Sequence, residues 1–262
     1  MMDGRSKRMT FRFLGTGTSV GVPQIGCTCK TCTSADPRDT RRRCGAYVRM
    51  GDVGLLIDTP PEMREACIAY GIDRVDAIAL THSHMDHVAG FDDVRRFNTI
   101  NGKTVLPCYA SAETEAQMHR IFPYVGVKGG ENGLFRPQVA FHNADSFSVG
   151  GIEVERFPVE HGFPCCGYIL NGAIAYVSDC HALPASTVER ISGVGILVID
   201  CLRERPHPTH LSKDEALSII ERIAPGRAYI THMCHDLTHE EWLERLRGTC
   251  VEPAYDGLEL EV

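Results

Sequence analysis

Short apolar runs recur along this chain, and each one ends at a side chain that can bind a metal ion. The runs are five to nine residues long and rich in aliphatic and β-branched residues, which is typical of buried strands. Parallel strands that pack side by side bring their carboxyl ends to one edge of a sheet, where α/β folds place their sites. The runs are 75–81 before His82, 152–160 before His161, 173–178 before Asp179, 195–199 before Asp200, and 227–231 before His232.

Helix signals lie between these runs. Two capping boxes, in which a Ser or Thr is followed three residues later by Glu, precede segments with apolar residues at helical spacing. Proline in a first turn, serine at an N-cap and glycine after the last turn mark two more helices. The predicted helices follow Ser212, follow Thr238, run from Pro61 to about Tyr70 before Gly71, and run from Ser111 towards Ile121.

The beginning of the chain reads as antiparallel or mixed sheet. A strand is predicted over 9–13, and a hairpin around Gly51 and Asp52 joins predicted strands over 46–50 and 54–58. Together these elements predict an α/β protein in which sheets are flanked by helices. We expect a single domain over residues 1–262, with two similar halves that meet near residue 145.

Composition narrows the class of protein. The chain has 262 residues, 43% of them apolar and 23% charged, which suits a large buried core. Its net charge is −7 and it has no long basic run, so a stable nucleic-acid partner is not expected. No apolar stretch is long enough for a signal peptide or a membrane span, so we expect a cytoplasmic protein. In that compartment the 12 cysteines favour free thiols and metal ligands over disulfides.

The strongest chemical signal is the segment Thr81–His87, which reads THSHMDH. His82 and His84 are two residues apart, so in extended chain their side chains point the same way. Asp86 and His87 follow where the chain should turn into a helix, and can face a second point. An exposed polar loop is the alternative, but clusters of His and Asp this dense usually coordinate metal. The segment therefore indicates two adjacent metal ions.

The H-x-H-x-D-H pattern at 82–87, after a strand that ends at Asp58 and Thr59, resembles the metallo-β-lactamase superfamily of metal hydrolases. A lone His, an Asp and a final His follow later strands in the order that this family shows. The resemblance spans nearly the whole chain and implies a four-layer αβ/βα sandwich with a two-metal site on one edge. It implies that His82, His84 and His161 hold one ion, that Asp86, His87 and His232 hold the other, and that Asp179 bridges both.

Some assignments within this ligand set have rivals. Asp200 also ends a strand and competes with Asp179, although order along the chain favours Asp179. Asp58 and Asp200 are expected to orient ligand imidazoles by hydrogen bonds. His and Asp ligands with a bridging carboxylate suit zinc, manganese or iron.

The segment GCTCKTC offers Cys27, Cys29 and Cys32, and a closed zinc site needs a fourth ligand. His235, three residues after His232, is one such ligand. This arrangement resembles the cyclic phosphodiesterases of phosphonate breakdown, which act on phosphoribosyl 1,2-cyclic phosphate, and the resemblance implies one structural zinc. The competing fourth ligands are Cys234 and His239, and the competing interpretation is three reduced thiols beside a surface histidine.

Two further side chains are assigned to the substrate. In the related phosphodiesterases a His after the equivalent of Asp200 contacts phosphate and protonates the leaving group, a role that falls here to His210, with His207 as its rival. Arg95 could bind the far end of the substrate, although Arg95 and Arg96 could equally pair with Asp92 and Asp93. Residues about 97–140 are expected to set specificity.

The predicted function is hydrolysis of a small, cyclic phosphodiester, such as a cyclic nucleotide or a ribose cyclic phosphate. Two ions held ~3.5–4 Å apart can share a bridging water and lower its pKa to about 7, which yields a metal-bridging hydroxide. Asp86 and His210 are the predicted catalytic residues. The alternatives are an RNase Z-like RNA endonuclease, a thioester or lactone hydrolase, and a non-catalytic nucleotide-binding protein. A homodimer is left open.

Overall fold

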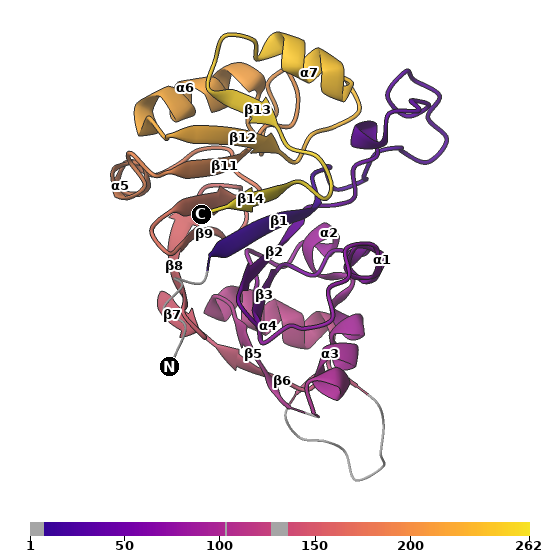
Figure 1. Ribbon diagram of the computed structural model, residues 1–262, viewed down its shortest axis with the longest axis vertical. Helices are drawn as coiled ribbons and strands as arrows, with labels where there is room; N and C mark the ends of the chain where they lie inside the picture. Colours follow the sequence, from indigo (N-terminus) through magenta and orange to yellow (C-terminus); the bar gives the residue numbers. More distant parts are fainter. Residues whose placement is uncertain (1–7, 103, 127–135) are drawn as a thin grey trace.

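The computed structural model describes residues 8–102, 104–126 and 136–262. Within these residues two seven-stranded sheets pack face to face, and helices cover the outer face of each sheet (Figure 1). One core cluster fills the space between the sheets and two others lie under the helices. The four-layer αβ/βα sandwich expected from the sequence is confirmed.

The first sheet is built mainly from the N-terminal half of the chain. Its first three strands along the chain are antiparallel, including the predicted hairpin, and the strands from β3 to β6 are parallel. In spatial order the strands are β14 (Glu259–Glu261), β1 (Met9–Gly15), β2 (Gly45–Met50), β3 (Val53–Ile57), β4 (Ala77–Ala79), β5 (Leu106–Tyr109) and β6 (Val139–His142). The C-terminal β14 pairs with β1 and so returns to this sheet, which the division of the sequence near residue 145 did not foresee.

The second sheet is built from the strands that follow β6 in the chain, β7 to β13. Its outer strands β7, β8 and β9 are antiparallel, and β10 to β13 are parallel. In spatial order the strands are β13 (Val251–Pro253), β12 (Arg227–Thr231), β11 (Ile196–Asp200), β10 (Ile174–Val177), β9 (Cys165–Leu170), β8 (Ile152–Val159) and β7 (Ser146–Val149). All five predicted strands are present, although β4 covers only the centre of the predicted 75–81 run.

The helices follow the predicted caps with one exception. Ser212 and Thr238 both form complete capping boxes, and Ser111 caps its helix through the N–H of Thr114. The exception is the helix predicted to begin at Pro61, because the N–H of Met63 donates to the carbonyl of Pro60 in a separate turn that precedes the helix. The longer helices are α1 (Met63–Ala69), α3 (Arg95–Ile100), α4 (Ala112–Ile121), α5 (Ala185–Arg190), α6 (Lys213–Ile223) and α7 (His239–Arg245). The shortest are the α-helix α2 (Met85–Val88) and the 3-10 helices η1 (Pro37–Asp39) and η2 (Phe91–Val94).

The strand directions bring the chemically active residues to one edge of both sheets. β3, β4 and β5 are parallel, and β8, β10, β11 and β12 run in one direction in the second sheet. The sheets are joined at this edge, where the N–H of Cys166 donates to the carbonyl of Thr81 at 3.1 Å and the Tyr168 hydroxyl donates to the carbonyl of Leu80 at 2.6 Å. The loops after β4, β8, β10, β11 and β12 therefore meet at one place.

Candidate metal centre

Three imidazoles form the first cluster of the site. His82 Nε2 lies 3.0 Å from His84 Nδ1, and His161 Nε2 lies 3.4 Å from the same His84 nitrogen. His82 and His161 are buried, and His84 is half-buried. Two imidazoles bound to one zinc ion at ~2.0–2.1 Å in tetrahedral geometry would have their nitrogens ~3.3 Å apart. The spacing of these three rings therefore suits a single cation.

The second cluster consists of two imidazoles and two carboxylates. His87 Nε2 lies 3.4 Å from Asp86 Oδ2 and 2.9 Å from Asp179 Oδ1. His232 Nε2 lies 3.7 Å from Asp86 Oδ2 and 3.3 Å from Asp179 Oδ2. Asp179 Oδ2 also lies 3.6 Å from His161 Nε2 in the first cluster. The Asp179 carboxylate thus lies between the two clusters, as a bridging ligand would.

The ligand imidazoles are oriented from behind by hydrogen bonds. Asp58 Oδ2 lies 2.8 Å from Nδ1 of His87, and the same carboxylate accepts from the N–H and the hydroxyl of Thr81, each at 2.8 Å. The Thr81 hydroxyl lies 3.0 Å from His82 Nδ1. On the other side, His161 Nδ1 donates to the carbonyl of Thr209 at 2.8 Å. Such partners fix which ring nitrogen faces a metal ion.

Two residues of the site have a backbone conformation that side chains seldom adopt. Asp58 has φ of 60° and His232 has φ of 59°, both in the left-handed region. Such conformations cost about 1–3 kcal/mol each and persist only when their surroundings enforce them. One of these residues is a candidate ligand and the other binds the candidate ligand His87. Their strained backbone indicates that the fold is selected for where these side chains lie.

Several buried polar atoms at the centre of the site have no hydrogen-bond partner among the described residues. They include His87 Nε2, His232 Nε2 and Asp179 Oδ1, although His87 Nε2 and Asp179 Oδ1 are only 2.9 Å apart. Burial costs a polar atom free energy unless it has a partner. A divalent cation between these atoms would satisfy all three, so the donor set fits a metal ion.

The electrostatics of the two clusters differ. Burial lowers the pKa of all three imidazoles of the first cluster, that of His161 to about 4, which favours neutral rings. At His232 burial also disfavours the charged form, but Asp179, Asp86 and Asp200 outweigh it and raise the pKa to about 9. The carboxylates therefore make the electrostatic potential in the second cluster negative. A bound cation would be stabilised there in place of a proton on His232.

His210 lies against the centre, on the loop after β11. Its ring stacks on that of His232 with centroids 4.5 Å apart, and its Nδ1 lies 2.7 Å from Asp200 Oδ2 and 4.0 Å from Asp179 Oδ2. Asp200, expected to orient a ligand imidazole, instead orients His210, because the Cys180 N–H and His210 both converge on its Oδ2. The rival His207 accepts from Thr209 and lies outside both ligand clusters.

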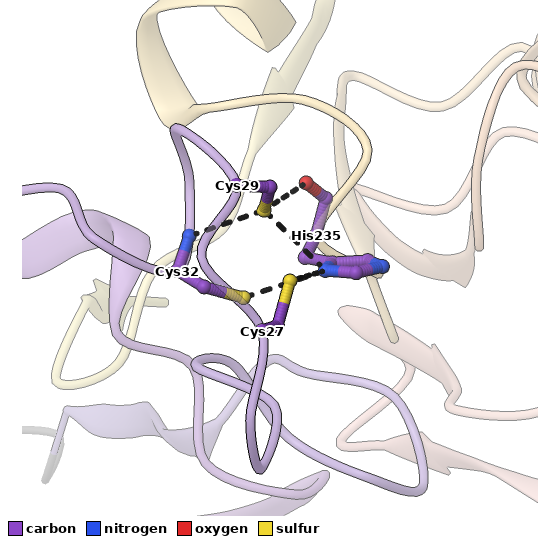
Figure 2. Close-up of side chains that lie close together, drawn as sticks. All are labelled: Cys27, Cys29, Cys32 and His235. Atoms are coloured by element: carbon purple, nitrogen blue, oxygen red, sulfur yellow. Dashed lines mark hydrogen bonds between the residues drawn. The ribbon is translucent and has the colours of Figure 1, made fainter.

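The second predicted metal site lies where the N-terminal loop meets the segment after β12. Figure 2 shows three sulfur atoms around one ring nitrogen of His235. The Sγ atoms of Cys27, Cys29 and Cys32 lie 3.3, 3.5 and 3.4 Å from His235 Nδ1. A tetrahedral zinc with bonds of ~2.3 Å to sulfur and ~2.0–2.1 Å to nitrogen would separate S and N by ~3.5 Å, so the cluster fits zinc.

The chemistry of these cysteines agrees with that fit. The N–H of Cys32 is the main cause that lowers the pKa of Cys29 to about 6, whereas burial raises the pKa of Cys32 to about 11. The cluster therefore favours a thiolate at Cys29, and a bound cation would be needed to ionise Cys32. The competing ligands lie elsewhere: Cys234 Sγ accepts from the N–H of Asp236, and His239 packs against Tyr255. The structure thus brings together the four residues that the sequence analysis selected.

The structure does not test the residues that were predicted to bind substrate or set specificity. Arg95 pairs with Asp92 at 2.8 Å, as one interpretation of the sequence had it, so its predicted contact with substrate stays a prediction. The specificity segment 97–140 includes residues 103 and 127–135, which lie outside the described residues. Sequence reasoning missed Thr81 and Thr209 as supports of ligand imidazoles. Thr81 directly precedes His82, which is the one signal that could have pointed to it.

The fold and the two ligand clusters define a metal-dependent hydrolase of the metallo-β-lactamase fold. The β-lactamase superfamily domain family matches residues 54–233, and the chain belongs to that family. The matched range contains every residue of the two ligand clusters and His210, but leaves out Cys27, Cys29, Cys32 and His235.

Particular relatives narrow the comparison. The chain is 39% identical to a new diphosphatase from the PhnP family, whose crystal structure superposes with a TM-score of 0.89 over 97% of both chains. It is 34% identical to an octanoyltransferase of Porphyromonas gingivalis over 94% of this chain, and it spans only 50% of that relative's length. It is 25% identical to a ribonuclease Z of Methanopyrus kandleri, over 62% of this chain and 50% of that one. The hydrolase is therefore of the PhnP type.

Proposed function

We propose that this chain is a two-metal phosphodiesterase that hydrolyses a small, cyclic phosphodiester, such as a cyclic nucleotide or a ribose cyclic phosphate. The observation that carries the proposal is the convergence of two ligand clusters on the shared carboxylate of Asp179, with His210 beside them. Two cations and a proton donor suit phosphodiester cleavage, because the ions would activate water and stabilise phosphoryl charge and the donor would protonate the leaving oxygen. The likeness to a PhnP-family diphosphatase supports a phosphoryl substrate.

The ligand clusters would hold two divalent ions, zinc or manganese, and the cysteine cluster one structural zinc. His82, His84 and His161 would bind one catalytic ion, and Asp86, His87 and His232 the other, with Asp179 shared. When bound, such a pair lowers the pKa of a shared water to about 7 and accepts the oxygens of a phosphoryl group. Asp58 and Thr209 keep the Nδ1 atoms of His87 and His161 engaged, so that the Nε2 atoms of these rings face the ions.

His210 is suited to protonate the leaving oxygen. A carboxylate only accepts hydrogen bonds, so Asp200 holds the proton of His210 on Nδ1 and fixes the ring against His232. The other ring nitrogen is then the one available to deliver a proton. A leaving alkoxide needs that proton far more than a leaving phosphate does. Arg95 stays a predicted contact for the far end of the substrate, and to serve it would have to give up its pairing with Asp92.

A diphosphate linkage is a second candidate substrate, because the 39% identical relative is described as a diphosphatase. Acyl thioesters are a third, because an octanoyltransferase aligns over nearly this whole chain, although the chain spans half of that protein. An RNase Z-like activity rests on the 25% identical relative and is opposed by the net charge of −7. A non-catalytic nucleotide-binding role is opposed by the family and by the complete ligand set.

A turnover panel on the metal-loaded protein tests these candidates together. The panel contains an aryl phosphodiester, 2′,3′- and 3′,5′-cyclic nucleotides, a ribose cyclic phosphate, a nucleoside diphosphate sugar, an octanoyl thioester, a lactone and a precursor tRNA. We expect the highest kcat/KM on a cyclic phosphodiester. Turnover confined to the thioester or lactone would end the phosphodiesterase proposal, and preference for the diphosphate would change the substrate class but keep the metal centre.

The proposal also covers the compartment of the reaction and the oligomeric state of the chain. None of the helices among the described residues is long and apolar enough to cross a bilayer. We place the reaction in the cytoplasm, where thiols stay reduced and the cysteine cluster can hold zinc. A homodimer is compatible with this proposal, and light scattering on the purified protein tests it.

A further inference from the structure

The position of His232 raises a physical problem. This ligand has φ of 59°, in the left-handed region, which costs a residue with a side chain free energy. The chain after it, from Met233 to Leu237, belongs to no helix or strand. Its first residues are held from outside, because the N–H of Met233 donates to the carbonyl of Thr16 and the N–H of Cys234 donates to the carbonyl of Leu202, each at 2.9 Å. Something in the surroundings must therefore hold this segment so that His232 Nε2 stays directed at Asp86 and Asp179.

Arg41 lies directly against this segment. Its guanidinium donates to the carbonyl of Cys234 at 2.6 Å and to the carbonyl of Leu237 at 2.9 Å. The Arg41 side chain has no exposed surface, and the Asp39 carboxylate, which is also buried, lies 3.4 Å from the guanidinium. Asp39 Oδ1 in turn accepts from the N–H of His239 at 2.6 Å, at the start of α7. The buried Arg41–Asp39 pair thus binds the segment at two carbonyls and the start of α7 at one N–H.

The Arg41 backbone is itself fixed on the opposite side. It forms two hydrogen bonds with Val22, at 2.8 and 2.9 Å. It also lies against Gly17, where an added Cβ would come within 2.6 Å of the Arg41 carbonyl oxygen. Next to Gly17, the carbonyl of Thr16 accepts from the N–H of Met233 at 2.9 Å. Two segments that lie against each other, one around Gly17 and one around Arg41, therefore hold the chain that follows His232.

We propose that Arg41 is a positioning residue of the metal centre, which fixes the Cys234–Leu237 segment and thereby keeps His232 directed at its cation. The proposal rests on the proposed two-metal centre, for which His232 supplies a donor. A planar guanidinium with several donors suits this role, because it can bind two carbonyl oxygens and a carboxylate at once. Burying a charged arginine for packing alone would be costly, whereas its contacts here fall on the residues around His232.

The test removes the contacts without leaving a buried charge unpaired. Replacing Arg41 alone would strand the Asp39 carboxylate and could unfold the protein. The double variant Arg41→Met with Asp39→Asn removes both charges and keeps an oxygen to accept from the His239 N–H. The matched control is Arg74→Met with Asp76→Asn, an arginine–carboxylate pair before β4, at the opposite edge of the sheet.

Two measurements are made on each protein. The first is the number of ions retained per chain against chelators of graded strength, with thiolate-to-cobalt absorption reporting separately on the cysteine cluster. The second is hydrogen exchange of the metal-free protein. In the double variant we expect one ion per chain to be lost about 10- to 100-fold more readily than in the parent, the range for partners of ligands. We also expect at least ~10-fold faster exchange at residues 233–237, with α6 unchanged.

Parental ion retention in the double variant would overturn the proposal. So would exchange that accelerates equally in the 233–237 segment and α6, because Arg41 would then support the fold as a whole. A parent protein that never holds two ions at this centre would instead refute the proposed metal centre, while the exchange measurement would still decide whether Arg41 holds the segment.

Discussion

Asp58→Asn tests how much the metal centre depends on the carboxylate behind His87. Asparagine tolerates the left-handed backbone of this position (φ 60°), so the change leaves the main chain unstrained. One side-chain oxygen can still accept from the N–H of Thr81. The other oxygen becomes an NH₂ group, which faces the Thr81 hydroxyl and His87 Nδ1, each 2.8 Å from it in the parent.

The expected loss of metal affinity follows from replacing a carboxylate oxygen, which accepts, by an NH₂ group, which donates. His87 loses a hydrogen bond to a charged acceptor, worth ~1.5–3 kcal/mol. Its Nδ1 must now accept rather than donate, which moves the ring proton to Nε2, the atom that faces Asp86 and Asp179. At 1.4 kcal/mol for each tenfold change, the affinity of the second cluster for its ion should fall about 10- to 140-fold.

The assay is competition of the variant and the parent with a chelator of known affinity, followed by metal analysis. The control is Asp76→Asn, which changes a carboxylate that accepts from the Gly54 N–H at the opposite end of β4. We expect the control to retain metal as the parent does, and Asp58→Asn to lose one ion per chain first. Parental affinity in Asp58→Asn would refute the reasoning that this carboxylate sets the His87 tautomer.

Three further predictions follow from other parts of the molecule. His210→Ala should lower kcat by about 10²–10⁴-fold on substrates with alkoxide leaving groups and much less on an aryl phosphodiester; equal losses on both, measured by steady-state kinetics, would exclude its role as proton donor. Cys29→Ser should release the structural zinc, seen as one ion fewer by metal analysis, while the catalytic ions remain; unchanged zinc content would count against the Cys/His cluster. Ser212→Ala removes the cap of α6 and should cost about 1 kcal/mol, or ~2–4 °C in Tm; an unchanged melting curve would contradict the cap's contribution.

The metal ligands could be predicted from the sequence, because they lie either in one dense cluster or directly after predicted strands. His82 and Asp86 lie in one dense cluster, so their spacing alone indicates metal. His161, Asp179 and His232 each follow a buried strand, and the sheet brings strand ends together whatever lies between them. Backbone periodicity therefore placed these three side chains at strand ends, and the resemblance to a family selected them as ligands and divided them between two ions.

The supporting residues could not be predicted because their contacts leave no pattern. Thr209 supports His161 through a main-chain carbonyl, which every residue has. Arg41 reaches carbonyls of residues 193 and 196 positions away in the chain, a pairing that no local pattern signals. Asp200 ends a strand like Asp179, and only the fold shows that it binds His210 instead of a metal-facing imidazole.

The most direct test of the account is a crystal structure of the metal-loaded protein with anomalous data at the absorption edges of the bound metals. We predict two ions ~3.5–4 Å apart that share Asp179, one bound by His82, His84 and His161 and the other by Asp86, His87 and His232. A third ion should lie among Cys27, Cys29, Cys32 and His235. A single ion at the centre, or ions that leave Asp179 unbound, would contradict the account.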